Sequence, residues 1–439
     1  MSKEITLENG CVKKLFFKFA IPSILGMLIV SMQIMIDGMF LSKGVGPNGL
    51  AAVNISMPLI NTLMSIALMI CIGGGVLVSI TRGENNFDKA KSLTTLTLCL
   101  FFGVLLFLSL FILFNLSSVI KFLGANETLY PYVKTYLSIS VGGAIFFNMP
   151  IFTETFVRIA GKPNQVFISG LICFLGNVIL DYVFILKLNM GMEGAAIATC
   201  FANMFGSLVL LPHIEFGELK FTLEEIKDIF YNGSSEMLTT ISSAFTTYIF
   251  NIIIMKKIGI LGVSALTIVF YINTIVNISL YGLSQALQPI VSYNIGAKRI
   301  DKIKDVLKIA LISGGIIGSV TFICTQLFSD TLINLFTNGN DELHKLTNSA
   351  IFFFAFAYLL SFINIIASSF HTSIEKPFES ALIACGRSII FVVIPLLTLP
   401  LILGDVGIWI ATPIAELICL LVSIPLTLKS LHKLNIKFS

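Results

Sequence analysis

Two residues able to hold a proton or a cation interrupt a long apolar stretch of this chain. The run from Val166 to Leu186 is long enough to cross a bilayer as a helix, and it carries Asn177 and Asp181 one helical turn apart on the same face. A carboxylate at that depth costs roughly 2.5–3.5 kcal/mol on insertion scales, so it is expected to face a cavity and mark a site. The spacing therefore predicts a buried site on this segment that binds an ion or a proton.

Two further oxygen-bearing residues are expected at the same depth. After a Gly-rich turn the chain re-enters an apolar segment, which places Thr199 about as far from the turn as Asp181. Asp37 lies near the outer end of a helix expected over residues 15–41. Hydrocarbon disfavours a charged carboxylate and a neighbouring carboxylate disfavours it further, so a proton fits the site. Na⁺ also fits, because it prefers oxygen ligands; a purely structural hydrogen-bonded cluster is the alternative.

The composition predicts an all-helical integral membrane protein. Of the 439 residues, 56% are hydrophobic and only 12% are charged, which no water-soluble fold could cover. The apolar runs are about 20 residues or longer, as expected of membrane helices and not of barrel strands. Twelve spans are expected near 15–41, 50–80, 92–120, 130–157, 165–187, 193–212, 232–255, 262–295, 306–329, 346–371, 380–403 and 406–428.

An internal repeat divides the chain into two halves. Sliding the sequence against itself by 213 or 214 positions matches Lys43 with Lys256, Gly83 with Gly296, and Lys162-Pro163 with Lys376-Pro377. Each half contains an even number of spans, so the repeats are expected to be parallel six-helix lobes. The predicted division is an N-terminal lobe over 1–212, a cytoplasmic linker over 213–231 and a C-terminal lobe over 232–439.

The two halves differ at the acidic residues. Asp37 is matched by Phe250, and Asp181 is matched by Pro395. The duplicated fold therefore does not need these acids, which favours a functional role for them in the N-terminal lobe alone.

The charges predict how the chain lies in a cell membrane. Placing both termini in the cytoplasm assigns most of the 28 Lys and Arg residues to inner segments, among them the loop with Lys298 and Arg299. Within the linker, Thr222 and Glu225 have the spacing of a capping box, which predicts a short amphipathic helix there. Membrane topology also accounts for the net charge of +4, so nucleic acid is not expected as a partner.

Other polar residues in the spans are candidates for binding a substrate. Glu416 lies near the middle of the last span and could bind a cationic group, whereas Glu154 is expected to pair with Arg158 one turn away. Two interpretations of Glu236 stay open, an interfacial residue and a functional one, and His371 is expected at a solvated helix end. The candidate substrate-binding residues are Gln33, Asn148, Glu154, Asn273, Gln288 and Glu416.

The motifs of several other protein classes are missing from the sequence. Gly73-Gly74-Gly75 is not followed by Gly-Lys-Ser/Thr, so it is read as a place of close helix packing and not as a phosphate loop. No set of nucleophile, base and acid and no metal-ligand spacing was found, so neither an enzyme nor a bound cofactor is expected. The energy source is therefore expected to be an ion gradient.

The chain resembles the MATE (multidrug and toxic compound extrusion) family along essentially its whole length. The residues that carry the resemblance are Ala20-Ile21-Pro22-Ser23, Asp37, Gly49-Leu50-Ala51-Ala52, Arg158-Ile159-Ala160-Gly161, Asn177 with Asp181, and Gly194-Ala195-Ala196-Ile197-Ala198-Thr199. The resemblance implies twelve helices in two lobes and drug export coupled to inward H⁺ or Na⁺. The cation site that it implies in the N-terminal lobe consists of Asp37, Asn177, Asp181 and Thr199.

The sequence departs from the family pattern at the start of the seventh span. Asn232-Gly233-Ser234-Ser235 lacks the Pro that commonly opens this helix, and Glu236 comes too early to match an acidic residue found deeper in the helix in some branches. These departures favour an ion site in the N-terminal lobe over one in the C-terminal lobe.

The sequence therefore predicts a secondary antiporter that exports amphipathic or cationic small molecules by alternating access of two lobes. A flippase or exporter of a lipid-linked or other endogenous metabolite on the same fold is the alternative. A receptor or a membrane enzyme is disfavoured, since neither an output domain nor a catalytic set is seen. A monomer suffices for this mechanism, and the choice between H⁺ and Na⁺ is left open.

Overall fold

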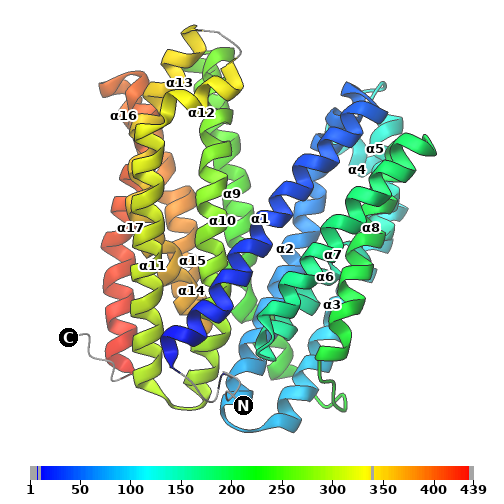
Figure 1. The fold of residues 1–439 in the computed structure, drawn as a ribbon, viewed down its shortest axis with the longest axis vertical. Coiled ribbons are helices and arrows are strands. Elements are labelled where there is room, and N and C mark those ends of the chain that lie inside the picture. Colours follow the sequence, from blue (N-terminus) through cyan, green and yellow to red (C-terminus); the bar gives the residue numbers. More distant parts are fainter. Residues whose placement is uncertain (1–6, 8–10, 338–340, 435–439) are drawn as a thin grey trace. The chain divides into compact units, whose positions relative to one another are not determined.

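The computed structural model describes residues 7, 11–337 and 341–434, and the regular elements within them are all helices (Figure 1). The first half contains α1 (Val12–Gly44), α2 (Pro47–Gly83), α3 (Phe87–Phe114), α4 (Leu116–Phe122), α5 (Tyr130–Gly142), α6 (Ala144–Ile159), α7 (Pro163–Asp181), η1 (Tyr182–Lys187), α8 (Gly191–Leu210) and η2 (Leu211–His213). The second half contains α9 (Leu223–Lys257), α10 (Ile260–Gly296), α11 (Ile300–Leu327), α12 (Ser329–Thr337), α13 (Asp341–Phe354), η3 (Ala355–Ala357), α14 (Tyr358–Ser373), α15 (Pro377–Cys385), η4 (Gly386–Ile390), α16 (Phe391–Leu403) and α17 (Asp405–Lys433).

The predicted all-helical membrane fold is confirmed. Within the described residues, 11 helical segments are long and apolar enough to span a bilayer, and the bent pair α5 and α6 brings the number to 12. Two spans are broken where the sequence predicted continuous helices. The third ends at Asn115, whose side-chain amide donates to the carbonyl oxygen of Phe111 over 2.9 Å. The fourth bends by 48° between α5 and α6, next to Gly143.

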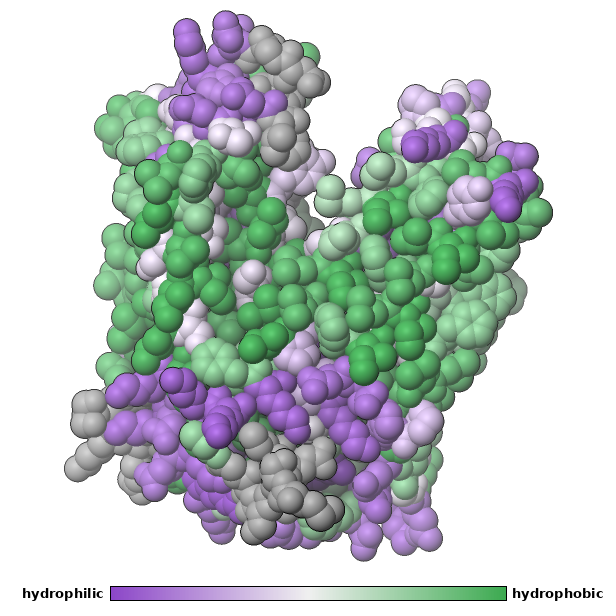
Figure 2. Space-filling model, in the orientation of Figure 1, coloured by the Kyte–Doolittle hydropathy of each residue, from purple (hydrophilic) through white to green (hydrophobic). Residues whose placement is uncertain are grey.

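The chain forms two compact units. One unit, here called the N unit, consists of Ile21–Gly233, and the other, the C unit, consists of Met1–Ala20 together with Ser234–Ser439. Helices α1 and α9 therefore each begin in one unit and end in the other. On the face shown in Figure 2, hydrophobic residues cover the middle of each unit and hydrophilic residues gather at the ends, as a membrane-spanning bundle requires.

The internal repeat is visible in the backbone. Helices α2 and α10 both have 37 residues, and α3 and α11 both have 28. Gly46 and Gly259 precede α2 and α10 with φ of 86° and 89°, a conformation that glycine adopts without steric cost. The turns after α2 and α10 contain Asn85 and Lys298, which also have positive φ. The two halves thus repeat both helix lengths and turn geometry at the offset found in the sequence.

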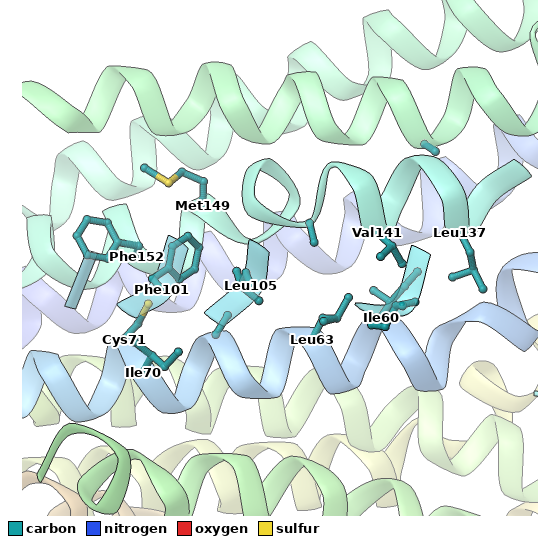
Figure 3. Packing of buried hydrophobic residues seen from close by; sticks show 14 of the residues in the cluster. Ile60, Leu63, Ile70, Cys71, Phe101, Leu105, Leu137, Val141, Met149 and Phe152 are labelled. Atoms are coloured by element: carbon teal, nitrogen blue, oxygen red, sulfur yellow. The ribbon is translucent and has the colours of Figure 1, made fainter. Parts of the chain in front are cut away.

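The core of the N unit is a continuous apolar cluster between α2, α3, α5 and α6 (Figure 3). Its centre contains the ring of Phe152, whose centroid lies 5.9 Å from that of Phe101 and 4.5 Å from that of Phe156. Ile70 and Cys71 of α2 are fully buried in the same cluster. The cluster also includes residues of α1, α7 and α8, the helices that carry the predicted site.

The glycine triplet of α2 lets three different helices approach closely, as the sequence predicted. A Cβ on Gly73 would lie 1.9 Å from the carbonyl oxygen of Ile229 in α9. A Cβ on Gly74 would meet Thr97 of α3, and a Cβ on Gly75 would meet Thr155 of α6. The triplet is therefore a helix-packing element and not a ligand loop.

The predicted short helix of the linker is wrong. The capping box is present, because the backbone N–H of Thr222 donates to Glu225 over 2.9 Å and the N–H of Glu225 donates to the Thr222 hydroxyl over 3.2 Å. The helix that it opens does not stop in the linker, because α9 continues without a break from Leu223 to Lys257. The seventh span and the amphipathic segment before it form one helix.

The segment before this cap is tied to the first turns of α3. Thr95 and Gly217 exchange hydrogen bonds of 2.9 and 3.0 Å, and Ser92 and Lys220 exchange bonds of 2.6 and 3.2 Å. Glu215 lies 3.4 Å from Lys91 and 3.6 Å from Arg82 in ion pairs. We call residues 214–220 the strap, since they bind along α3 as a fixed segment of the N unit.

Candidate functional site

The four residues predicted to hold a cation lie on three helices of the N unit. Asp37 is on α1, Asn177 and Asp181 are on α7, and Thr199 is on α8. Helix α7 begins with Pro163 in its first turn, where a missing N–H leaves no hydrogen bond unmade. After Asp181 the helix changes to the π-helical turn η1, which widens the backbone directly beside the carboxylate.

The carboxyl groups of Asp37 and Asp181 face each other. The two side chains lie within interaction distance of each other. Asp181 is 1% exposed, and Asp37 is half-buried. Both oxygens of Asp181 and Oδ1 of Asp37 are buried without a hydrogen-bond partner. Two acids in this arrangement need a proton or a cation between them, since buried like charges repel.

The two neutral residues predicted for the site carry further oxygen atoms. Asn177 is fully buried, and neither its Oδ1 nor its Nδ2 has a hydrogen-bond partner. The Thr199 hydroxyl donates to the carbonyl oxygen of Ala195 over 3.1 Å, so its lone pairs point away from that bond. Carboxylate, amide and hydroxyl oxygens are the donors that a hard monovalent cation prefers. Among the described residues, no three His, Cys, Asp or Glu side chains meet in a metal-binding group.

Tyr136 belongs to the same site and was missed in the sequence. It is a buried residue of α5, and it lies within electrostatic range of both Asp37 and Asp181. A tyrosine in an apolar helix gives the same sequence signal as a core aromatic residue, so its periodicity alone could not single it out. Its phenol adds a polar group beside the acid pair.

The structure divides the six predicted substrate-binding residues between the two units. Gln33, Asn148 and Glu154 are in the N unit, and Asn273, Gln288 and Glu416 are in the C unit. Asn148 is buried and donates to the carbonyl oxygen of Ala144 over 2.8 Å, while its own Oδ1 has no partner. Gln33, Asn273 and Gln288 are half-buried.

The predicted pair of Glu154 and Arg158 is confirmed. Arg158 Nη2 lies 3.2 Å from Glu154 Oε2 in the same helix, α6. The charge of Glu154 is therefore neutralised by its own helix. Glu236 lies half-buried on α9.

Glu416 is also neutralised by the chain. Arg387 donates to its Oε1 from Nε over 3.0 Å and from Nη2 over 2.6 Å. Asn364 donates to Oε2 over 2.7 Å, and the Ser423 hydroxyl donates to the Asn364 side-chain oxygen over 2.6 Å. With both carboxylate oxygens hydrogen-bonded, Glu416 has no free charge for a cationic substrate in this arrangement.

The expectation that His371 lies at a solvated helix end is wrong. Its side chain is fully buried near the end of α14. Its Nε2 lies 3.4 Å from the hydroxyl of Thr427 in α17, and its Nδ1 is buried without a partner. Helices α14 and α17 pack against each other here, and this packing excludes the water that the sequence position suggested.

Comparison with known proteins assigns the chain to a family. The model of the MatE family matches residues 22–183 and 237–399, one segment in each half. The chain belongs to the MatE family. The resemblance seen in the sequence is thereby confirmed, and the family is one of membrane transporters.

The relatives of this MATE protein include curated and structurally solved transporters. The multidrug export protein MepA of Staphylococcus aureus is 23% identical over 350 residues, which cover 77% of each chain. MepA of Staphylococcus saprophyticus is 22% identical over 342 residues, or 75% of each chain. An outward-facing structure of a multidrug resistance MATE transporter superposes with a TM-score of 0.93 at 20% identity and covers 99% of both chains. A mutant of the Vibrio cholerae MATE transporter VcmN gives 0.91 at 19% identity over 96% of this chain and 97% of its own.

Proposed function

We propose that this protein is a secondary antiporter that exports amphipathic, cationic compounds in exchange for H⁺ or Na⁺. The observation that carries the proposal is the buried pair of Asp37 and Asp181, whose facing oxygens lack hydrogen-bond donors. Membership of the MATE family and the multidrug export function in the names of the MepA relatives support the choice of substrates.

The four site residues have separate roles in this mechanism. Asp37 and Asp181 supply the negative charge, and Asn177 and Thr199 supply neutral oxygens. A proton or Na⁺ that enters the site neutralises the pair and removes the repulsion between the two acids. The bound and empty states then differ in charge beside the buried Asp181, where the low dielectric increases the effect of a charge.

Helix α1 is the element through which that change of charge acts. It carries Asp37, and Pro22 lies inside the same helix, where the ring removes a backbone hydrogen bond. The helix can therefore bend at Pro22 when a bound proton or Na⁺ changes the electrostatic force between Asp37 and Asp181. Cation entry from outside favours release of the substrate, and alternating access of the two units completes the exchange.

The polar candidates Gln33, Asn148, Asn273 and Gln288 provide neutral contacts to a substrate. Their neutral side chains tolerate varied ligands, because a hydrogen bond to an amide restricts the position and orientation of a ligand less than a buried ion pair does. Arg158 neutralises Glu154 and Arg387 neutralises Glu416, so we propose neither glutamate as a contact for a cationic substrate.

We place the protein in the cell membrane with both termini in the cytoplasm. The excess of Lys and Arg in the loops assigned to the inner side supports this orientation. The proposed cation site is built from residues of one chain, so a monomer is sufficient for the exchange.

Accumulation of a fluorescent cationic dye in cells that express the protein tests the proposed function. Wild-type protein should lower accumulation, and Asp37→Asn should abolish that effect because the asparagine cannot change charge. Asp305→Asn makes the same chemical change at an exposed position of α11 and should export like wild type. Unchanged export by Asp37→Asn would show that Asp37 is not part of the cation site. No export by the wild-type protein would show that cationic dyes are not its substrates.

A further inference from the structure

The ion pair of the C unit has a neutral counterpart in the N unit. The repeat offsets of 213 and 214 match Asn203 with Glu416 and Cys173 with Arg387. In the N unit the Cys173 thiol donates to the Asn203 side-chain oxygen over 3.2 Å, so the same two positions are again in contact. The duplicated fold thus makes this contact without charges. Since burial of two charges costs several kcal/mol per ion before their attraction offsets it, the charges in the C unit need a reason other than folding.

The groups around Glu416 suit a proton and not a metal ion. Asn364 presents its Nδ2 donor to Glu416, and its oxygen is already bonded to Ser423. A cation would need oxygen ligands in these places. Tyr281 of α10 and Cys419 of α17 lie within electrostatic range of Arg387, and neither supplies a positive charge. If Arg387 moved away, Oε1 of Glu416 would lose both of its donors, and a proton is what could neutralise it.

Arg387 lies on an element that can turn. It belongs to η4, a π-helical turn of five residues between α15 and α16. A π turn holds one residue more than an α turn, so its relaxation to α geometry rotates the residues in it by about 100°. The side chain of Arg387 is 15% exposed and that of Glu416 is 4% exposed, so Arg387 is the residue of the pair that is less enclosed and can move away.

Polar side chains continue from Glu416 along the interface of α14 and α17. One turn after Ser423 in α17, Thr427 lies next to His371 of α14. Near the C-terminal end of α17, Lys376 Nζ donates to the Ser430 hydroxyl over 2.8 Å. The charged groups within range of His371 are Lys376 and Glu379. These polar pairs lie one after another along α14 and α17, from Glu416 to the turn that holds Lys376.

We propose that Glu416 is a second proton-binding site, which takes up one proton on Oε1 when Arg387 withdraws during transport. The carboxylate becomes a neutral acid, the guanidinium keeps its proton and charge, and the proton comes from the solvent. This inference rests on the proposed transport function, because it needs a cycle in which η4 moves.

Infrared difference spectra of the purified protein in lipid, recorded on addition of ethidium, test this site. A carboxylic acid that gains or loses a proton gives a carbonyl band, and we expect one band to be lost in Glu416→Gln. The double variant Arg387→Cys/Glu416→Asn copies the neutral pair of the N unit. It should fold with a thermal midpoint close to wild type and lack the same band.

The outcomes separate this site from the site of Asp37. Asp37→Asn should remove a different band and leave that of Glu416. A wild-type spectrum without any band that depends on Glu416 would overturn the inference, even if Asp37→Asn has lost export. Failure of the double variant to fold would also overturn it, because the charges would then be required by the structure.

Discussion

The buried acid pair of the N unit, which we propose binds the coupling ion, lowers the stability of the folded protein. Asp181 has two buried oxygens without partners, and a group of this kind destabilises a folded protein by about 1–3 kcal/mol. We predict that Asp181→Asn raises the thermal midpoint of the purified protein, because the substitution removes a buried charge and keeps the shape. The same variant should lose substrate export. Thermal unfolding and dye export measured on one preparation check both parts.

The control for this prediction is a carboxylate that already has its partner. Glu154→Gln leaves Arg158 buried without its counter-charge, so it should lower the thermal midpoint where Asp181→Asn raises it. A loss of stability in Asp181→Asn equal to that in Glu154→Gln would show that Asp181 has a structural partner.

The sequence could predict individual site residues only where their chemistry was unusual for a membrane helix. Asp37, Asn177 and Asp181 were found because polar groups at that depth are costly. Tyr136 was not found, since an aromatic residue is ordinary in an apolar helix. The pairing of Arg387 with Glu416 was also missed, because hydropathy places a residue along a helix but does not tell which neighbour its side chain meets.

At the scale of elements, the approach of α2 to α9 depends on a single missing side chain. A Cβ on Gly73 would overlap the carbonyl oxygen of Ile229, which cannot move without shifting the helix. We predict that Gly73→Val lowers the thermal midpoint and the yield of folded protein, with a loss of about 1–3 kcal/mol from overpacking. Size-exclusion chromatography and thermal unfolding measure both quantities.

The matched control is an exposed glycine in the middle of α3. A Cβ on Gly103 would have no atom within 4 Å, so Gly103→Ala should leave the midpoint unchanged or raise it. Equal loss in the two variants would point to helix propensity as the cause instead of packing.

The strap provides a second prediction for an element. A Cβ on Gly217 would lie 2.8 Å from Cβ of Lys91, so Gly217→Val should detach residues 214–220 from α3. We expect trypsin to cleave after Lys220 faster in this variant than in wild type, because cleavage needs a loose backbone. Glu218→Gln changes only an exposed pair with Lys220 and should not alter the rate. Rapid cleavage of the wild-type strap would contradict the fixed arrangement.

Helix existence was predictable from the sequence, but helix interruption was not. Long apolar runs identified all the spans, and the capping box of Thr222 and Glu225 gave the start of α9. The bend at Gly143 and the π turns η1 and η4 depend on packing against neighbouring helices, which apolar periodicity does not record. The length of α9 was missed because charged residues in its first turns resemble a linker.

At the scale of the whole molecule, the orientation in the membrane can be tested by labelling. We predict that a cysteine in place of Glu127 reacts with an impermeant thiol reagent in intact cells, and that one in place of Lys298 reacts only after the cells are opened. Both positions lie in turns between helices, and the repeat and the positive charges place them on opposite sides. The exposed native residues Cys11, Cys99 and Cys324 are first replaced by Ser. Labelling of position 298 in intact cells would invert the topology.

The duplication explains how two similar units can have different chemistry. The repeats share helix lengths and turn conformations, so the fold constrains them alike. Their buried polar centres differ, with an acid pair in the N unit and an ion pair in the C unit. The shared features account for the common fold, and we propose that the polar centres that differ serve ion coupling.

Ion flux into proteoliposomes measures the central claim most directly. Wild-type protein is reconstituted with a cationic dye inside, and dye exit is followed while a proton or a sodium gradient is imposed separately. The account predicts that one of the two gradients drives dye exit with ion entry, and that Asp181→Asn abolishes both movements while it stays folded. Exchange by Asp181→Asn at the wild-type rate would contradict it.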